Sequence, residues 1–451
     1  MNIFLGVLIG ILVMTVVVTV HEFGHFIVAK RNGVNVKEFG IGFPPKAKTW
    51  LHIPTEKAKE YCKKFDLSEA KTDKILAKAE KKGKGKYVWI PLPKSEWYEE
   101  TDEGLMPKTQ DYLIFSLNWL PIGGFCQMDG ETNIDTRKGT FGAASIWSKT
   151  KILFAGVTMN WLLAFVIFTI LAWTGMPELF DNQWRVESDT FYDDTSYVEI
   201  AEVFENTPAA AAGLKSGNII VNAKAKDDEI VTQITKASDL QTFNKDHIGE
   251  TVYYGVRCAA DDNCMPKDVE VTLNPDGEKY TLGISMGQFG LNKFHTTWSA
   301  PIVAAVSTVQ ITGETFRGLG QLVFDLFSGV ASQFSSDEAV KEAGKNRLEA
   351  AGDSVSGPVG IIGVLFPAIA ETGLTNTLFL VAIISISLAC MNVLPIPALD
   401  GGRWFLIILF EKILRKKLTP EIENKIVSRA FIVLLILAGL VTILDVMKIV
   451  R

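Results

Sequence analysis

The sequence predicts a polytopic α-helical membrane protein with four transmembrane helices and separate parts outside the membrane. Four apolar segments lie at roughly residues 3–29, 152–174, 375–397 and 428–448. Each is about as long as a helix that crosses the hydrocarbon core of a bilayer. The 451 residues are 48% hydrophobic, yet 21% of them are charged. The charged residues must therefore be concentrated between the apolar segments.

The first apolar segment is expected to be a retained transmembrane helix over residues 1–29. Residues 3–20 contain no charged side chain, and the cleavage pattern of a signal peptide is missing. The stretch 357–370 is apolar but too short to span a bilayer, so we expect it to be re-entrant or interfacial. Residues 299–370 as a whole predict amphipathic or interfacial helices, because polar residues such as Arg317 interrupt their apolar pattern.

The distribution of Lys and Arg predicts the orientation of the spans. Cations follow the first span, precede the second, and separate the third from the fourth: Lys30, Arg31, Lys149, Lys151, Arg415, Lys416 and Arg429. The amino terminus, in contrast, has no charged side chain before Glu22. By the positive-inside rule the amino terminus is outside and residues 30–151 are cytoplasmic. Residues 175 to about 300 are then outside. The net charge of −6 gives no reason to expect nucleic-acid binding.

A pattern with metal-binding spacing stands near the end of the first span, His21-Glu22-Phe23-Gly24-His25. Imidazoles at i and i+4 share one helical face and can bind one zinc ion, while the glutamate can act as a general base toward water. The alternative is a chance match in a helix. Two of the five histidines and a glutamate are costly at bilayer depth unless they are paired, metal-bound or functional. The pattern therefore predicts an intramembrane zinc site.

The third zinc ligand is expected to be Asp400. In the predicted topology the first and third spans run in the same direction, so their carboxyl ends reach the same depth. Asp400 follows the third span within Asn392–Gly402, whose two prolines break the helix. A catalytic zinc usually takes three protein ligands. The alternatives are a helix-capping role for Asp400, or the weaker competitors Asp129 and Asp445.

These motifs resemble those of the site-2 protease family, and within it the bacterial regulator of sigma-E protease group. The resemblance covers most of the chain. It is carried by HEFGH at 21–25, GIGFPP at 40–45, PIGGF at 121–125, AGxxxN at 155–160 and NVLPIPALDGG at 392–402. The chain departs from the family pattern at Gly156-Val157, where relatives usually have Gly-Pro.

The resemblance implies a role for each of these residues. It assigns His21, His25 and Asp400 as zinc ligands and Glu22 as the general base. It further implies that four residues hold an unwound substrate: Asn160, Asn392, Pro395 and Pro397. An asparagine inside a span can equally form hydrogen bonds between helices, and for Asn160 this alternative stays open.

Residues 30–151 are expected to form a cytoplasmic or membrane-associated β region. Residues 36–43 and 111–120 have the composition of strands bounded by Gly and Pro, which predicts a hairpin or small sheet. In the family such a sheet lies near the active site, where an exposed edge could pair with substrate; a purely structural hairpin is the alternative. Between these strands, residues from about 47 to 110 predict a Lys-rich helical insert. It is either a solvated helical hairpin or a segment that docks on anionic lipid headgroups.

Outside the membrane, residues 203–220 resemble the signature of bacterial PDZ domains. The pattern predicts one PDZ-like α+β domain over about residues 195–290, on the extracytoplasmic side. Residues 282–284 are expected to lie beside a peptide groove or to form a plain closing strand. Cys258 and Cys264 of this domain are expected to form a disulfide, since disulfides persist in oxidising compartments.

Together these features predict an intramembrane zinc metalloprotease of the bacterial cytoplasmic (inner) membrane. The third transmembrane helix is expected to be broken within residues 375–413, and the fourth to cover 428–448. The resemblance implies that the substrates are single-span membrane proteins, anti-sigma factor-like proteins or signal-peptide remnants. Membrane lipid is the other expected partner. The alternatives are a catalytically silent PDZ scaffold with a structural zinc site, and a metal transporter.

Overall fold

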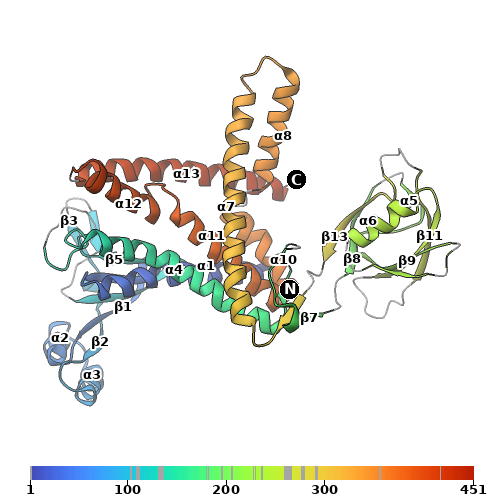
Figure 1. Cartoon of the computed structure of the whole chain (residues 1–451). Helices are drawn as coiled ribbons and strands as arrows, with labels where there is room; N and C mark the ends of the chain where they lie inside the picture. The colour runs from blue at the N-terminus through green and yellow to red at the C-terminus, as the bar shows by residue number, and fades with distance from the viewer. Residues whose placement is uncertain are drawn as a thin grey trace. The chain divides into compact units, whose positions relative to one another are not determined.

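Figure 1 shows the computed structural model of the chain. The chain divides into two compact units, of which the first comprises Met1–Ile167 and Ala305–Arg451 and the second Phe168–Ala304. The structure describes residues 3–101, 104–107, 112–130, 137–178, 180, 182–193, 197–204, 207–226, 228, 230–234, 237–258, 267–275, 280–289, 293–354, 357–416 and 418–450.

Four of the described helices are long and apolar enough to cross a membrane. They are α1 (Ile3–Arg31), α4 (Ile146–Thr174), α11 (Leu374–Val393) and α13 (Pro420–Val450). The four predicted spans therefore correspond to four candidate membrane-spanning helices. The long helix α7 (Ala300–Ser332) is not one of these candidate spans, and it is followed by α8 (Glu338–Ser354).

The short apolar stretch near residue 360 is helical and packs on the first span. It consists of α9 (Pro358–Gly360), the π-helical turn η4 (Ile361–Leu365) and α10 (Phe366–Glu371), and α10 and η4 both contact α1. The buried carboxylate of Asp445, on α13, accepts hydrogen bonds from the backbone N–H groups of Gly357 at 3.0 Å and Gly360 at 2.8 Å. It thereby satisfies donors that the start of a helix leaves unpaired. This contact explains why an aspartate is tolerated in an apolar helix.

The third span ends where its sequence turns to proline. After Val393 the backbone is not helical until α12 (Asp400–Ile407), which continues into the π-helical turn η5 (Ile408–Ile413). Gly401 and Gly402 lie against the linking segment, because a Cβ on Gly401 would lie 2.2 Å from the Val393 carbonyl oxygen and one on Gly402 would lie 2.0 Å from that of Ile396. The two glycines therefore let α12 begin directly beside the broken segment, with Asp400 as its first residue.

A three-stranded antiparallel sheet follows the first span. Its order is β2 (Tyr87–Pro91), β1 (Val36–Pro54) and β5 (Leu113–Met128). The predicted strand at 36–43 is too short, because the insert supplies β2 as a second partner and β1 continues to Pro54. The insert also contains η1 (Thr55–Lys57), α2 (Ala58–Lys64), α3 (Glu69–Lys82), η2 (Lys94–Glu96), β3 (Tyr98–Thr101) and β4 (Gly104–Pro107).

The insert has a hydrophobic core of its own, built between one face of this sheet and the two helices. Leu51 and Ile53 of β1 pack there with Tyr61 of α2 and with Ile75 and Ala79 of α3. Figure 1 shows α2 and α3 beside β2. The Lys-rich segment is thus a folded helical pair on a sheet.

The second unit contains a six-stranded antiparallel sheet and two helices. The strand order is β12-β11-β9-β8-β13, with β10 paired to β9. The elements are β8 (Tyr197–Val203), α5 (Pro208–Ala211), β9 (Asn218–Ala225), β10 (Thr232–Gln233), α6 (Ala237–Asp246), β11 (Thr251–Cys258), β12 (Lys267–Thr272) and β13 (Ile284–Phe289). Leu240 and Phe243 of α6 pack into the same core as Tyr254 of β11. The predicted disulfide falls outside the described residues, because Cys264 is not among them.

A small sheet is formed by strands from the beginning and the end of this unit's sequence. It pairs β6 (Met176–Pro177), β14 (Lys293–Thr296) and β7 (Thr190–Asp193), which follows η3 (Glu187–Asp189). Asp189 accepts hydrogen bonds from the backbone N–H groups of Thr297 at 3.0 Å and Ser299 at 2.9 Å, just before α7. Burial acts to raise the pKa of Asp189, but the hydrogen bonds from Ser299 and Thr297 lower it to about 2. The carboxylate therefore stays ionised at the start of α7, where the helix dipole also favours a negative charge.

Candidate metal centre

The two histidines of the HEFGH motif meet Asp400 in the first unit. The Nε2 atom of His21 lies 3.0 Å from Oδ2 of Asp400, and Nε2 of His25 lies 3.2 Å from the same oxygen. All three ligand atoms lie within 4.8 Å of one another. The helical spacing of α1 brings the imidazoles together, and the break after α11 places Asp400 opposite them. The structure thus brings together the three residues that the sequence predicts as metal ligands.

The surroundings of these residues fit a zinc ion. His21 and His25 are 5% and 6% exposed, so their ring nitrogens are largely shielded from water. Two imidazole nitrogens and one carboxylate oxygen are a donor set that catalytic zinc sites use, with a fourth position left for water or substrate. Across the described residues, this is the one group of three or more histidines, cysteines or acids that could hold a metal ion.

Gly156 lets the backbone of α4 approach both histidine rings closely. A Cβ built at this position would lie 2.5 Å from His21 Nε2 and 2.6 Å from His25 Nε2. Real Cβ atoms essentially never come this close to another heavy atom. A side chain at position 156 would therefore occupy the space next to both ligand nitrogens. Gly156 was not among the residues predicted for the site, although a glycine inside an apolar span is a sign that another group packs closely there.

His25 is oriented by a backbone carbonyl of α4. Its Nδ1 lies 2.8 Å from the carbonyl oxygen of Ile152. A carbonyl can only accept a hydrogen bond, so Nδ1 carries the proton and the lone pair of Nε2 is available to a metal ion. Hydrogen bonds of this kind commonly fix the tautomer and ring orientation of metal-binding histidines.

His21 has a corresponding neighbour in Asn160. The side-chain Nδ2 of Asn160 lies 3.4 Å from Nδ1 of His21, and the Oδ1 of this fully buried amide has no hydrogen-bond partner within the described part of the chain. The oxygen and nitrogen of an amide are assigned from the hydrogen-bond network. Turning the Asn160 amide by half a turn lets Oδ1 accept a hydrogen bond from His21 Nδ1–H. This arrangement pairs Oδ1 with His21 Nδ1–H and leaves the lone pair of His21 Nε2 available to a metal ion.

Glu22 is positioned by the sheet. The half-buried carboxylate accepts a hydrogen bond from the backbone N–H of Cys126 on β5, and it interacts electrostatically with His21, His25 and Asp400. The strand β5 packs against α1. The acid next to the first histidine is therefore held at the cluster by a backbone group that comes from outside its own helix.

The other predicted site residues lie along the segment that leads to Asp400. The Nδ2 of Asn392 donates to the carbonyl oxygen of Leu388, 3.1 Å away, in the last turn of α11. Pro395 and Pro397 lie in the non-helical link before α12. Their contribution to substrate binding stays a prediction.

The two weaker competitors for the third ligand position are engaged elsewhere. Asp129 forms ion pairs with Lys37 at 3.2 Å and with Arg137 at 3.9 Å. Asp445 accepts the hydrogen bonds from Gly357 and Gly360 described above.

Comparison with known proteins places the chain in a family. The model of peptidase family M50 matches residues 9–58 and 103–438, so most of the Lys-rich insert falls in the unmatched interval. The zinc metalloprotease RasP of Shouchella clausii is 27% identical over 471 residues, covering 97% of this chain and 98% of that protein. The regulator of sigma-W protease RasP of Bacillus subtilis is 26% identical over 462 residues, covering 95% of each chain. The chain therefore belongs to peptidase family M50, the site-2 proteases, and is an integral membrane zinc metalloprotease.

Proposed function

We propose that this protein hydrolyses peptide bonds in or near the transmembrane segments of single-span membrane proteins. The observation that carries the proposal is the cluster of three residues: His21 and His25 lie inside the candidate span α1, and Asp400 lies just after the candidate span α11. A catalytically silent scaffold and a metal transporter are the alternatives. Membership in a family of zinc metalloproteases favours the protease.

Each residue of the cluster has a proposed part in the reaction. His21, His25 and Asp400 would hold the zinc ion. When bound, zinc supplies Lewis-acid polarisation of a peptide carbonyl and makes water more acidic. Glu22 takes the proton from the attacking water and delivers it to the nitrogen of the leaving amine. The Cys126 N–H keeps the Glu22 carboxylate in place for both transfers.

The substrate is proposed to bind as an extended segment beside the metal centre. The strand β5 is at the edge of its sheet, and its exposed side chains include Trp119 and Ile122. An edge strand offers backbone groups that can pair with a peptide drawn out of helical form. Asn392, Pro395 and Pro397 would hold the other side of this segment.

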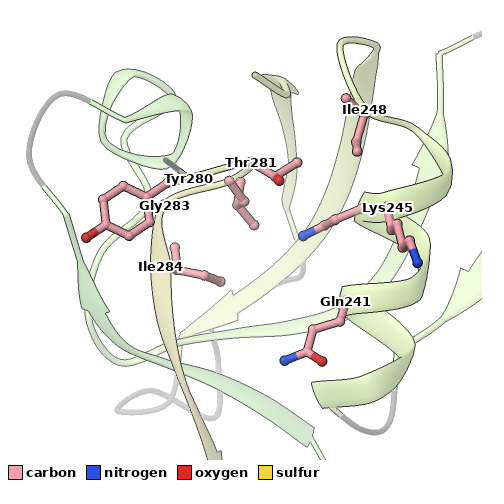
Figure 2. A pocket seen from close by; sticks show the side chains of 9 residues that line it. Gln241, Lys245, Ile248, Tyr280, Thr281, Gly283 and Ile284 are labelled. Atoms are coloured by element: carbon pink, nitrogen blue, oxygen red, sulfur yellow. The ribbon is translucent and has the colours of Figure 1, made fainter. Parts of the chain in front are cut away.

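We assign the sheet of the second unit to a PDZ-like domain that selects substrates outside the membrane. A cleft of about 270 Å³ lies between α6 and the chain that leads into β13. Figure 2 shows this cleft, with Gln241 and Lys245 on α6, Tyr280 and Gly283 in the loop, and Ile284 at the start of β13. Because β13 is an edge strand, a peptide in this cleft could add to the sheet as a further strand.

The proposed location is the bacterial cytoplasmic membrane, with the amino terminus and the PDZ-like domain outside. The positive charges that follow the first span and separate the third from the fourth support this orientation. The Bacillus subtilis relative is named as a regulator of sigma-W. On this basis we propose anti-sigma factor-like proteins as substrates, with signal-peptide remnants as a second source of single-span segments.

Removal of the metal tests the proposed function directly. Full-length protein in phospholipid nanodiscs is expected to cleave a single-span substrate, to lose this activity with a zinc chelator and to regain it when zinc is added. Asp400→Ala should lower the zinc content from about one ion per chain to near zero, because it removes one of three ligands. The matched control is Asp129→Ala, whose carboxylate pairs with Lys37. Activity that survives chelation, or equal zinc loss in both variants, would contradict the proposal.

Asn160 is predicted to support His21, and this role is distinguishable from substrate binding. If its amide oxygen accepts the His21 Nδ1–H, Asn160→Ala should weaken zinc binding about 10- to 100-fold. Asn160→Asp keeps an acceptor oxygen and should recover much of that loss. Zinc titration and steady-state kinetics of both variants provide the measurement. A raised KM with unchanged zinc affinity would instead assign Asn160 to the substrate.

Deletion of the PDZ-like domain is expected to broaden substrate choice. If the domain excludes proteins with intact outer parts, deleting residues 200–288 should allow cleavage of unshortened substrates, while shortened ones are cleaved as before. Zinc content of the deletion protein must match that of wild type for the comparison to hold. Unchanged selectivity in such a protein would show that the domain does not act as a filter.

A further inference from the structure

One face of the sheet β2-β1-β5 is aromatic and is not covered by the insert's own helices. Side chains alternate along a strand, and the residues that face α2 and α3 are Leu51, Ile53, Val88, Ile90 and Ile114. The residues between them in sequence and across the strands therefore lie on the opposite face: Trp50, His52, Tyr87, Trp89 and Phe115. We call these five residues the aromatic face.

The rings of the aromatic face contact one another. His52 lies 4.8 Å from Tyr87 and 4.3 Å from Trp89 between ring centroids. Phe115 lies 6.0 Å from Trp89 and 5.9 Å from Trp50. Tyr87 and Trp89 are nevertheless 46% and 44% exposed. A contiguous apolar surface of this kind on a folded segment indicates an interaction site.

The aromatic face continues to the first spanning helix. Phe115 stacks on Phe39 of β1 at 6.0 Å, and Phe39 in turn contacts Phe26 of α1 at 5.4 Å and Phe23 at 6.2 Å. Phe23 is 42% exposed on α1, a helix that is long and apolar enough to cross the membrane. The ring contacts therefore link an exposed ring of α1, through the buried Phe39, to the sheet.

Positive charges border this row of rings. The ammonium group of Lys30 lies 5.2 Å from the ring centre of Phe26, and that of Lys82 donates to the carbonyl oxygen of Tyr87 at 2.8 Å. Lys48 is exposed on the same face of β1 as Trp50. Burial lowers the pKa of His52, and Lys30 and Lys82 lower it further. The histidine is thus neutral at pH 7, and the lysines carry the charge.

We propose that the aromatic face lies in the headgroup layer of the bilayer and binds anionic phospholipid. Tyr and Trp prefer the membrane–water interface, and lysines close to it are attracted by anionic headgroups. Continuity with α1 favours lipid over a soluble partner. The strand β2, with Tyr87 and Trp89, lies within residues 59–102, which the family model does not match. Lipid contact here would fix β1 and, through it, the strand β5 that holds Glu22.

Photo-crosslinking of the full-length protein tests this proposal without relying on its activity or orientation. Trp89 is replaced by the photo-reactive amino acid p-benzoylphenylalanine, and the protein is placed in nanodiscs that contain phosphatidylglycerol and phosphatidylcholine at a known ratio. Lys78, exposed on α3, receives the same replacement as the matched control. We expect lipid adducts at position 89 and few at position 78. The share of phosphatidylglycerol among the adducts should be about threefold higher than its share of the nanodisc lipid. A single lysine near the membrane surface attracts an anionic headgroup by about 1 kcal/mol, which is enough for an enrichment of this size.

The charge of the lysines is tested in the same protein. Lys30→Gln, Lys48→Gln and Lys82→Gln, combined, should remove the enrichment of phosphatidylglycerol while adducts at position 89 remain. Equal lipid adducts at positions 89 and 78, or none at 89, would overturn the proposal. Crosslinks between two copies of the chain would assign the aromatic face to self-association instead. Cleavage activity and zinc content, measured in the same nanodiscs, report separately on the proposed protease function.

Discussion

Replacing Glu22 by Gln is expected to abolish cleavage while leaving zinc bound. The substitution removes the group that accepts the proton of the attacking water, and general-base catalysis contributes roughly 10²- to 10⁴-fold to such reactions. The glutamine has nearly the same shape and keeps an oxygen that can accept the hydrogen bond from Cys126. His21, His25 and Asp400 are untouched, so the zinc content should stay at the wild-type level.

The measurement pairs two readouts on one preparation. Initial rates of cleavage of a single-span substrate in nanodiscs are compared with zinc content per chain for wild type and Glu22→Gln. Glu56→Gln is the control, because Glu56 is an exposed carboxylate that accepts a hydrogen bond from Gly85 in the insert. Near-wild-type turnover in Glu22→Gln would rule out the proposed role of this carboxylate. Loss of zinc together with activity would make it a structural group of the site.

The parts of this site that follow from local sequence could be predicted, and the parts that depend on contacts between helices could not. The pairing of His21 with His25 is a consequence of helical periodicity alone. Asp400 required one further step, the argument that parallel spans end at the same depth. The prolines at 395 and 397 predicted the break in the helix that separates Asp400 from the third span. The structure places the three residues together.

The supporting groups, in contrast, left no local signal. The carbonyl of Ile152 that orients His25 and the N–H of Cys126 that holds Glu22 are backbone groups, present at almost every residue. Only the packing of α4 and β5 beside α1 decides which of them is used. The full length of β1 could not be predicted for the same reason, because the second half of this strand pairs with β2 of the insert. Asp445 looked like a possible ligand from composition, and only the position of Gly357 showed its actual use.

Gly156→Ala is predicted to prevent zinc binding and thereby to inactivate the enzyme. The added methyl group would lie 2.5 Å from His21 Nε2 and 2.6 Å from His25 Nε2, so the histidines or α4 must move. In most helices this substitution is favourable by about 0.5–1 kcal/mol, since alanine has the higher helix propensity. We therefore expect the metal-free variant to be as stable as metal-free wild type, and its zinc affinity to fall at least about 100-fold, because two ligands are displaced.

The comparison that isolates this effect is the shift in unfolding midpoint caused by zinc. A ligand that binds only the folded state raises the midpoint by an amount that depends on its affinity. Wild type and the control Gly439→Ala, where nothing lies within 4 Å of the added methyl group, should show the same zinc-dependent shift. Gly156→Ala should show almost none. A normal shift in Gly156→Ala would mean that the histidines bind zinc in another arrangement, and the close approach of α4 at Gly156 would then have no part in the site. If Gly156→Ala shows no zinc-dependent shift but has the same metal-free unfolding midpoint as wild type, Gly156 belongs to the metal centre. A folding defect would instead lower the metal-free midpoint as well.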